Sequence, residues 1–138
     1  MDCRRQAKKR GLVIRGPQKI WDSTLAACGL VYTKGQGESV LRQYHDITFA
    51  RFWKRELDIE NPAVVTAVLA EAGADTAGFV SYLAGEGPAE LERVCREAEE
   101  KGVFGVPSFI LDGELFWGRE HLLDIRDMLG GHASEKAS

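Results

Sequence analysis

Apolar side chains recur at intervals of three and four residues along most of the first hundred positions, a spacing typical of amphipathic helices. Gly or Pro interrupts this pattern at each boundary. The longest stretch, 38–57, carries a broad apolar stripe, so we expect a central helix that is contacted on more than one side. Asn61 before Pro62 is a helix start signal, and Asp75 is the expected cap of a short helix. The pattern predicts helices over 2–10, 22–33, 38–57, 62–72, a short segment after Asp75, and 88–101.

The pattern changes after residue 101. Two short apolar runs, 108–111 and 114–117, flank Asp112-Gly113, and Asp-Gly between such runs is the strongest short-range signal for a β-hairpin. A helix over 119–129 follows, and Gly130-Gly131 are expected to end it. A two-stranded hairpin is marginally stable by itself in water, and its edges carry unpaired backbone groups. A helix layer, a second chain or further residues must therefore cover or extend it.

The composition is that of an ordinary soluble globular domain. The chain has 138 residues, 44% hydrophobic and 28% charged, which excludes collagen-like and wholly disordered chains. No apolar run approaches the roughly 18 residues of a membrane span. The charged N-terminus lacks the apolar core of a secretory signal. We expect a single domain over 1–130, a loose tail over 131–138 and no membrane segment.

Basic residues are concentrated at the N-terminus, although the net charge is −3. Residues 1–19 hold seven basic side chains and one acidic one. Such a stretch is either an arm that contacts phosphates or a solvated face that pairs with acidic groups elsewhere. No aromatic residues are interleaved with these charges, as stacking on single-stranded nucleic acid requires. The sequence favours the solvated face and disfavours a nucleic-acid partner.

The cysteines indicate a reducing environment. Cys3, Cys28 and Cys95 form no C-x-x-C motif, and none of the three histidines lies at metal-ligand spacing from them. An odd number of thiols without a signal peptide predicts a cytoplasmic protein without a metal site. Cys28 and Cys95 fall on apolar helix faces and are expected in the core. Cys3 is expected to be exposed.

One segment resembles a known family. Residues 102–109 read GVFGVPSF and residues 112–118 read DGELFWG, in the order and spacing of the C-terminal half of the DsbA-like thioredoxin superfamily. The motif is most similar to that of 2-hydroxychromene-2-carboxylate isomerases and kappa-class glutathione transferases, and weaker matches extend the resemblance over residues 2–130. The implied fold is α+β and mostly α. A helical insert, 1–101, precedes the ββα half of a thioredoxin-like fold, 102–130, and the N-terminal βαβ half is lacking.

The resemblance also implies a ligand site. A cis peptide bond between Val106 and Pro107 would turn the Val106 amide and carbonyl outward, as a template for glutathione or a peptide backbone. Where the family has a small polar residue and Asp, residues 118–121 read GREH, so Arg119 would meet a carboxylate of glutathione and Glu120 its amine. Glu120 as a simple helix-capping acid is the alternative. The expected binding residues are Phe104, Val106, Pro107, Trp117, Arg119 and Glu120, with Phe104 and Trp117 as apolar walls.

The same resemblance places the family's active Cys or Ser in the half that this sequence lacks, so no catalytic residue is assigned. We expect a natural short variant; a fragment of a longer protein and a recruited module are the alternatives. One hypothesis for its function is a glutathione- or thiol-linked isomerase or oxidoreductase, or ligand binding at the cis-proline loop. The other is a non-catalytic helical binding module that takes a protein partner by strand addition. In either case we expect a homodimer through the 108–117 hairpin.

Overall fold

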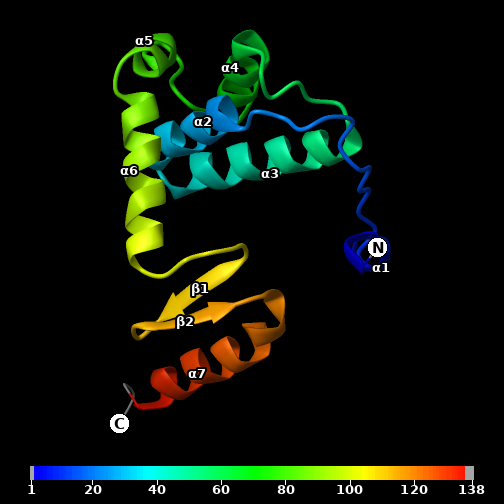
Figure 1. Ribbon diagram of the computed structural model, residues 1–138, viewed down its shortest axis with the longest axis vertical. Coiled ribbons are helices and arrows are strands. Elements are labelled where there is room, and N and C mark those ends of the chain that lie inside the picture. Colours follow the sequence, from blue (N-terminus) through cyan, green and yellow to red (C-terminus); the bar gives the residue numbers. More distant parts are fainter. Residues whose placement is uncertain (1, 136–138) are drawn as a thin grey trace. The chain divides into compact units, whose positions relative to one another are not determined.

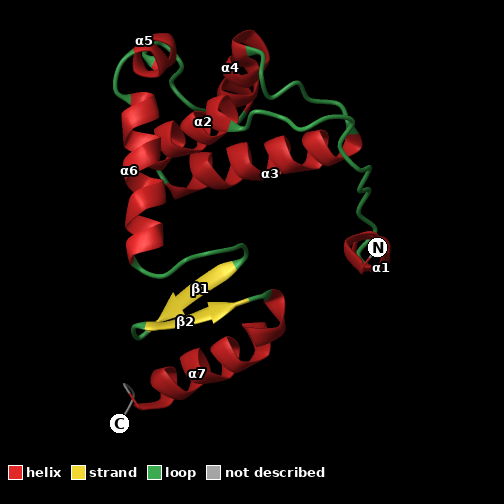
Figure 2. Cartoon of the chain, viewed as in Figure 1, coloured by secondary structure: helices red, strands yellow, loops and turns green. Residues whose placement is uncertain are grey.

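The chain folds into two compact units, residues 1–92 and residues 93–138 (Figure 1). The computed structural model describes residues 2–135. The helices of the first unit are α1 (Asp2–Lys9), α2 (Thr24–Lys34), α3 (Glu38–Lys54), α4 (Pro62–Glu71) and α5 (Phe79–Ala84), and α6 (Gly87–Glu100) crosses the boundary. The second unit continues with β1 (Ser108–Leu111), β2 (Glu114–Trp117), a 3₁₀ turn (Arg119–His121) and α7 (Leu122–Glu135). The predicted class, mostly helical α+β, is confirmed (Figure 2).

Local sequence signals set where several elements begin. The Asn61 Oδ1 atom accepts hydrogen bonds from the backbone N–H groups of Ala63 and Val64, at 3.0 and 3.4 Å. Pro62 occupies the first position of α4, where its missing N–H costs no hydrogen bond. The predicted start of this helix is therefore confirmed.

Asp75 does not cap α5. Its Oδ1 atom accepts a hydrogen bond from Ala77 N–H, in the turn that precedes the helix, and α5 itself starts after Gly78 without a side-chain cap. The prediction for this residue is wrong because the carboxylate is used one turn earlier.

In the second unit, α7 continues through Gly130-Gly131 to Glu135, so the predicted helix end is wrong as well. Residues 136–138 of the predicted tail lie outside the described residues.

Helix α3 ends at Lys54, three residues before its predicted end. Arg55 takes a left-handed conformation with φ of 64°, and its N–H donates to the carbonyls of Arg51 and Phe52. A left-handed residue terminates a helix because the chain direction changes there. Residues 55–57 therefore leave the helix axis, and Leu57 turns into the core.

The core lies among α2, α3, α4 and α5. Figure 1 shows α2 and α3 side by side. All buried apolar residues of the described chain lie between Ala7 and Tyr82. Cys28 is among them, as predicted, but Cys95 is exposed. The prediction for Cys95 is wrong because it lies on the part of α6 that belongs to the second unit, where no described apolar side chain is buried.

The basic N-terminal stretch has a partner within the first unit. The ammonium of Lys19 pairs with the carboxylate of Glu60, so at least this member of the basic N-terminal stretch is used inside the fold. Among the described residues, no helix is both long enough and apolar enough to cross a membrane.

The contact between α2 and α3 depends on one glycine. Tyr44 of α3 is 1% exposed, and its hydroxyl donates a hydrogen bond to the Ala26 carbonyl of α2 at 2.9 Å. A Cβ atom on Gly29 would lie 2.8 Å from Cζ of this ring. Burial raises the pKa of Tyr44 to about 12, so the hydroxyl stays protonated and remains a donor at neutral pH. Only glycine lets the two helices approach this closely.

We expect Gly29→Ala to lower the free energy of unfolding by about 1–3 kcal/mol, the usual cost of overpacking a core. Urea denaturation followed by circular dichroism measures this change. Gly35→Ala, at the residue that follows α2, is the control, since the nearest atom to its added Cβ lies at 3.8 Å. Equal stability of the two variants would contradict the proposed role of Gly29.

Candidate functional site

The hairpin has the predicted bounds. Strands β1 and β2 are antiparallel, with Ser108 opposite Trp117 and Phe109 opposite Phe116. Asp112 and Gly113 take positive φ values of 51° and 84°. A two-residue turn of this kind matches the right-handed twist of the flanking strands. The turn residues therefore determine the register, and the register sets which side chains share a face with Trp117.

The loop before β1 is anchored on both sides of Val106. Ser108 Oγ donates a hydrogen bond to the Gly105 carbonyl at 2.6 Å, and Gly118 N–H donates to the Pro107 carbonyl at 2.9 Å. The peptide bond between Val106 and Pro107 is cis. Neither backbone group of Val106 has a hydrogen-bond partner among the described residues, and the residue is 88% exposed. The second unit thus presents this short backbone segment to solvent.

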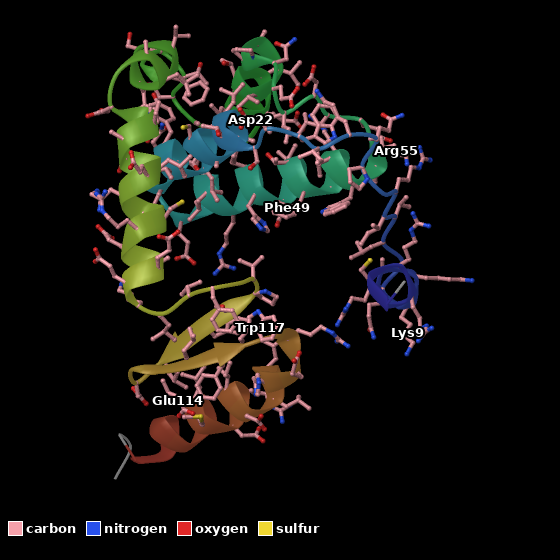
Figure 3. All side chains as sticks on the ribbon, viewed as in Figure 1. Lys9, Asp22, Phe49, Arg55, Glu114 and Trp117 are labelled. Carbon is pink, nitrogen blue, oxygen red and sulfur yellow. The ribbon has the colours of Figure 1, made fainter. Side chains whose placement is uncertain are left out.

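Two aromatic rings stand beside this segment. The ring centroids of Phe104 and Trp117 are 5.1 Å apart, and the rings are tilted by 52°. Phe104 is 71% exposed and Trp117 is 52% exposed, so the pair forms an open apolar surface. Figure 3 labels Trp117 on the strand. A Cβ atom on Gly105 would lie 2.7 Å from Trp117 Nε1, so glycine is required for the indole to lie over the loop.

The predicted charged residues follow β2 directly. Gly118 has a φ of 107°, and the chain then enters the 3₁₀ turn that contains Arg119 and Glu120. The Glu120 carboxylate folds back over Gly118, where it would collide with any added Cβ. Arg119 is exposed. The structure therefore brings Glu120 against the residue that hydrogen-bonds Pro107, and leaves the Arg119 guanidinium at the surface.

None of these described side chains is an activated nucleophile. The Ser108 hydroxyl is committed to the Gly105 carbonyl. Burial raises the pKa of the Cys28 thiol, which disfavours the thiolate. In the described part of the chain, His, Cys, Asp and Glu side chains do not gather in groups of three that would hold a metal ion.

Sequence reasoning missed two features. The first is the close approach of Trp117 to Gly105 and of Glu120 to Gly118. The only signal for it in the sequence is a glycine at each position. The second is a cavity within residues 17–59 of the helical unit, whose lining includes none of the predicted site residues. Its aromatic residues on α3 belong to the broad apolar stripe that predicts a central helix contacted on more than one side.

Comparisons with known proteins bear on the fold as a whole. A family model described as a DsbA-like thioredoxin domain matches residues 1–130. A 2-hydroxychromene-2-carboxylate isomerase of Sphingobium xenophagum is 29% identical over 101 residues, which cover 69% of this chain and 48% of that protein. One of Pseudomonas putida is 26% identical over 134 residues, which cover 94% of this chain and 63% of that protein.

A solved structure has a similar fold. It is titled as SeMet 2-hydroxychromene-2-carboxylate isomerase (HCCA isomerase), and it matches with a TM-score of 0.81 at 23% identity. The match covers 99% of this chain and 66% of that one. The likeness shows that the fold is shared. The chain spans about half to two thirds of the length of the proteins that it matches.

We expect Gly105→Ala to displace the indole of Trp117, because the added methyl group would lie only 2.7 Å from its Nε1 atom. The measurement is the indole N–H resonance of each tryptophan in a ¹H–¹⁵N spectrum. The Trp117 resonance is expected to move, while those of Trp21 and Trp53, which lie in the other unit, stay in place. An unchanged Trp117 resonance would contradict the packing described above.

Proposed function

The chain belongs to the DsbA-like thioredoxin domain family, and on this premise we propose that its 104–107 loop binds glutathione or a related thiol. The chain would act as part of a protein similar to 2-hydroxychromene-2-carboxylate isomerase. The observation that carries the proposal is the exposed Val106 backbone, which has free donor and acceptor groups and stands beside an aromatic pair.

The backbone supports the recognition of a peptide-like ligand. Glutathione is an extended tripeptide with amide groups of its own. A free N–H and a free C=O on one residue can pair with such a ligand in the manner of an added strand. The hydrogen bonds of Gly105 and Pro107 hold the two neighbouring peptide units in place, so little conformational entropy is lost on binding.

The side chains complement the remaining parts of glutathione. Phe104 and Trp117 offer an apolar surface for the thiol-bearing side chain or for a group attached to its sulfur. Arg119 matches a carboxylate in geometry and charge, and Glu120 matches the ammonium group. Glutathione carries both charges at its γ-glutamyl end, so one cation and one anion in adjacent positions suit it.

The reaction class that we propose is isomerisation rather than disulfide exchange. The curated relatives are named as isomerases. The three cysteines of this chain are free thiols, and Cys28 is buried. Disulfide exchange requires an accessible, low-pKa thiol with a nearby resolving partner. The contribution of this chain is to hold the thiol, and no residue is assigned as its nucleophile.

We expect reduced glutathione at millimolar concentration to shift the indole N–H resonance of Trp117 and to leave those of Trp21 and Trp53 in place. Trp117→Phe identifies the resonance. Arg119→Ala should weaken binding at least about tenfold, because a charged hydrogen bond is worth about 1.5–3 kcal/mol. Arg126→Ala is the control, since this exposed arginine of α7 is paired with Asp127.

The proposal fails if glutathione shifts no tryptophan resonance. It fails equally if Arg126→Ala and Arg119→Ala weaken binding to the same extent, because the effect would then reflect net charge alone.

The hairpin also supports an interaction between copies of the chain. The described sheet has two strands, so each strand has one edge without a backbone partner. Exposed apolar side chains occur on both strand and helix of this unit, including Ile110 of β1 at 47% and Leu123 of α7 at 62%. We propose that two copies pair their hairpins into a larger antiparallel sheet, as a homodimer in a reducing cytoplasm.

A non-catalytic module that adds a strand from another protein is the second candidate function.

Sedimentation equilibrium tests the homodimer, which should have twice the 15.3 kDa mass of one chain. We expect Ile110→Lys to shift the protein toward monomer, because a charge on a strand opposes edge pairing. Val13→Lys, at a similarly exposed apolar position of the first unit (49% against 47% for Ile110), should leave the dimer intact. A wild-type chain that sediments as a monomer would contradict the homodimer.

A further inference from the structure

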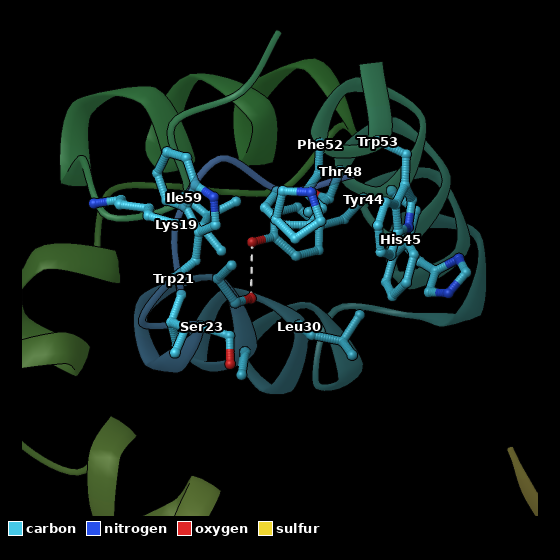
Figure 4. Close-up of a pocket in the computed structure, with 15 residues that line it drawn as sticks. Lys19, Trp21, Ser23, Leu30, Tyr44, His45, Thr48, Phe52, Trp53 and Ile59 are labelled. Carbon is cyan, nitrogen blue, oxygen red and sulfur yellow. Dashed lines mark hydrogen bonds between the residues drawn. The ribbon is translucent and has the colours of Figure 1, made fainter. Parts of the chain in front are cut away.

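The helical unit contains a cavity of about 530 Å³ between α2, α3 and the connector that precedes α2 (Figure 4). This volume lies within the range of about 300–1,000 Å³ that is typical of small-molecule sites. Five aromatic side chains contribute to its wall, namely Trp21, Tyr44, Phe49, Phe52 and Trp53. Small apolar residues, such as Ala26 and Ala27 of α2, leave the space between them open.

The cavity exists because α3 has more apolar surface than its neighbours cover. The broad stripe of this helix was expected to be buried, yet only Tyr44 on it is fully buried. Phe49 is 50% exposed, and Phe52 and Trp53 are partly exposed. Exposed aromatic surface that is concave and continuous is typical of ligand sites rather than of ordinary surface.

The groups at the cavity that can carry a charge, Lys19 and His45, have partners within the protein. The Lys19 ammonium pairs with Glu60, and this hydrogen bond lowers the pKa of the Glu60 carboxyl, so the pair stays ionised. The same ammonium lies 4.3 Å from the centroid of the Trp21 ring. His45 stacks on Phe49 at 4.5 Å.

Two hydroxyl groups lie deeper. That of Tyr44 donates to the Ala26 carbonyl, as the dashed line in Figure 4 shows. Thr48 Oγ1 is buried next to it and counteracts the rise of the Tyr44 pKa, but makes no hydrogen bond of ordinary geometry. Because it is covered, Thr48 Oγ1 is not offered to a ligand. The cavity therefore supplies aromatic and dispersion contacts, with little to compensate a charge.

The aromatic rings are arranged to receive another ring. Trp21 and Phe52 meet edge to face, with centroids 6.0 Å apart and planes at 77°. Phe52 and Trp53 do the same at 5.3 Å and 74°. In an edge-to-face pair only one of the two rings contacts the other with its face. Other ring faces therefore remain available for a ligand ring, by offset stacking or by edge contacts.

We infer that this cavity binds a small, uncharged aromatic molecule of up to two fused rings. The inference does not rest on the proposed thiol site. None of the residues lining the cavity belongs to the 104–120 segment, and the two sites are read out by different tryptophans.

The test uses indole as the probe and the full-length chain labelled with ¹⁵N. Indole is expected to shift the indole N–H resonances of Trp21 and Trp53 in a saturable manner, and to leave that of Trp117 unchanged. A chain in which indole shifts neither Trp21 nor Trp53 overturns the inference, whatever the result with glutathione.

A filling variant tests the location. Ala27 lines the cavity from α2, and Ala27→Phe places a ring inside it, so the dissociation constant for indole should rise at least tenfold. Ala50→Phe adds the same ring at an exposed position of α3 outside the cavity and should have no effect. If Ala27→Phe alters the circular dichroism spectrum, Ala27→Leu provides a smaller filling group. Unchanged affinity in a folded filling variant overturns the inference.

A charged analogue tests the class of ligand. Indole-2-carboxylate has the same rings and a negative charge, which no uncommitted cation among the described lining residues balances. We expect it to bind at least tenfold more weakly than indole, because the carboxylate must be desolvated. Binding as tight as that of indole would overturn the assignment to uncharged molecules.

Discussion

The helical unit depends on the contact between a tyrosine ring and a glycine. Tyr44 lies over Gly29, and its hydroxyl hydrogen-bonds the Ala26 carbonyl, so α2 and α3 are joined by packing and by a buried polar contact together. The unit repeats this arrangement further along the chain. Tyr82 lies against Gly87, where a Cβ would come within 2.7 Å of the ring, and its hydroxyl donates to Glu90 at 2.8 Å. In both cases a large ring replaces the volume that a side chain on the glycine would have filled.

Among its described residues the second unit has no buried apolar core, and backbone geometry holds it instead. The Asp112-Gly113 turn sets the strand register. The hydrogen bond from Gly118 to Pro107 ties the loop to the end of β2. In this unit Trp117 lies over Gly105, but the residue remains 52% exposed. An aromatic ring packed over a glycine therefore closes a core in the first unit but leaves an open surface in the second. We propose that thiol recognition takes place on this surface.

The two proposed sites differ in how they would recognise a ligand. The loop at Val106 combines free backbone groups with one positive and one negative side chain, which suits a zwitterionic peptide. The cavity between α2 and α3 has aromatic walls and committed polar groups, which suits an uncharged ring. Both contain exposed tryptophan or phenylalanine side chains. What separates them is whether polar groups next to the rings already have partners within the fold.

The sequence by itself determined the features that depend on neighbouring residues. Asn61-Pro62 predicted the start of α4, Asp112-Gly113 predicted the hairpin, and the 102–118 motif indicated the family. Caps and two-residue turns are local, so a few residues suffice to specify them.

The tertiary structure decided which apolar side chains are buried. Cys95 and Phe49 have the helical spacing of core residues, yet both are exposed. Whether an apolar face is covered depends on elements distant in the sequence, and helical periodicity carries no information about them.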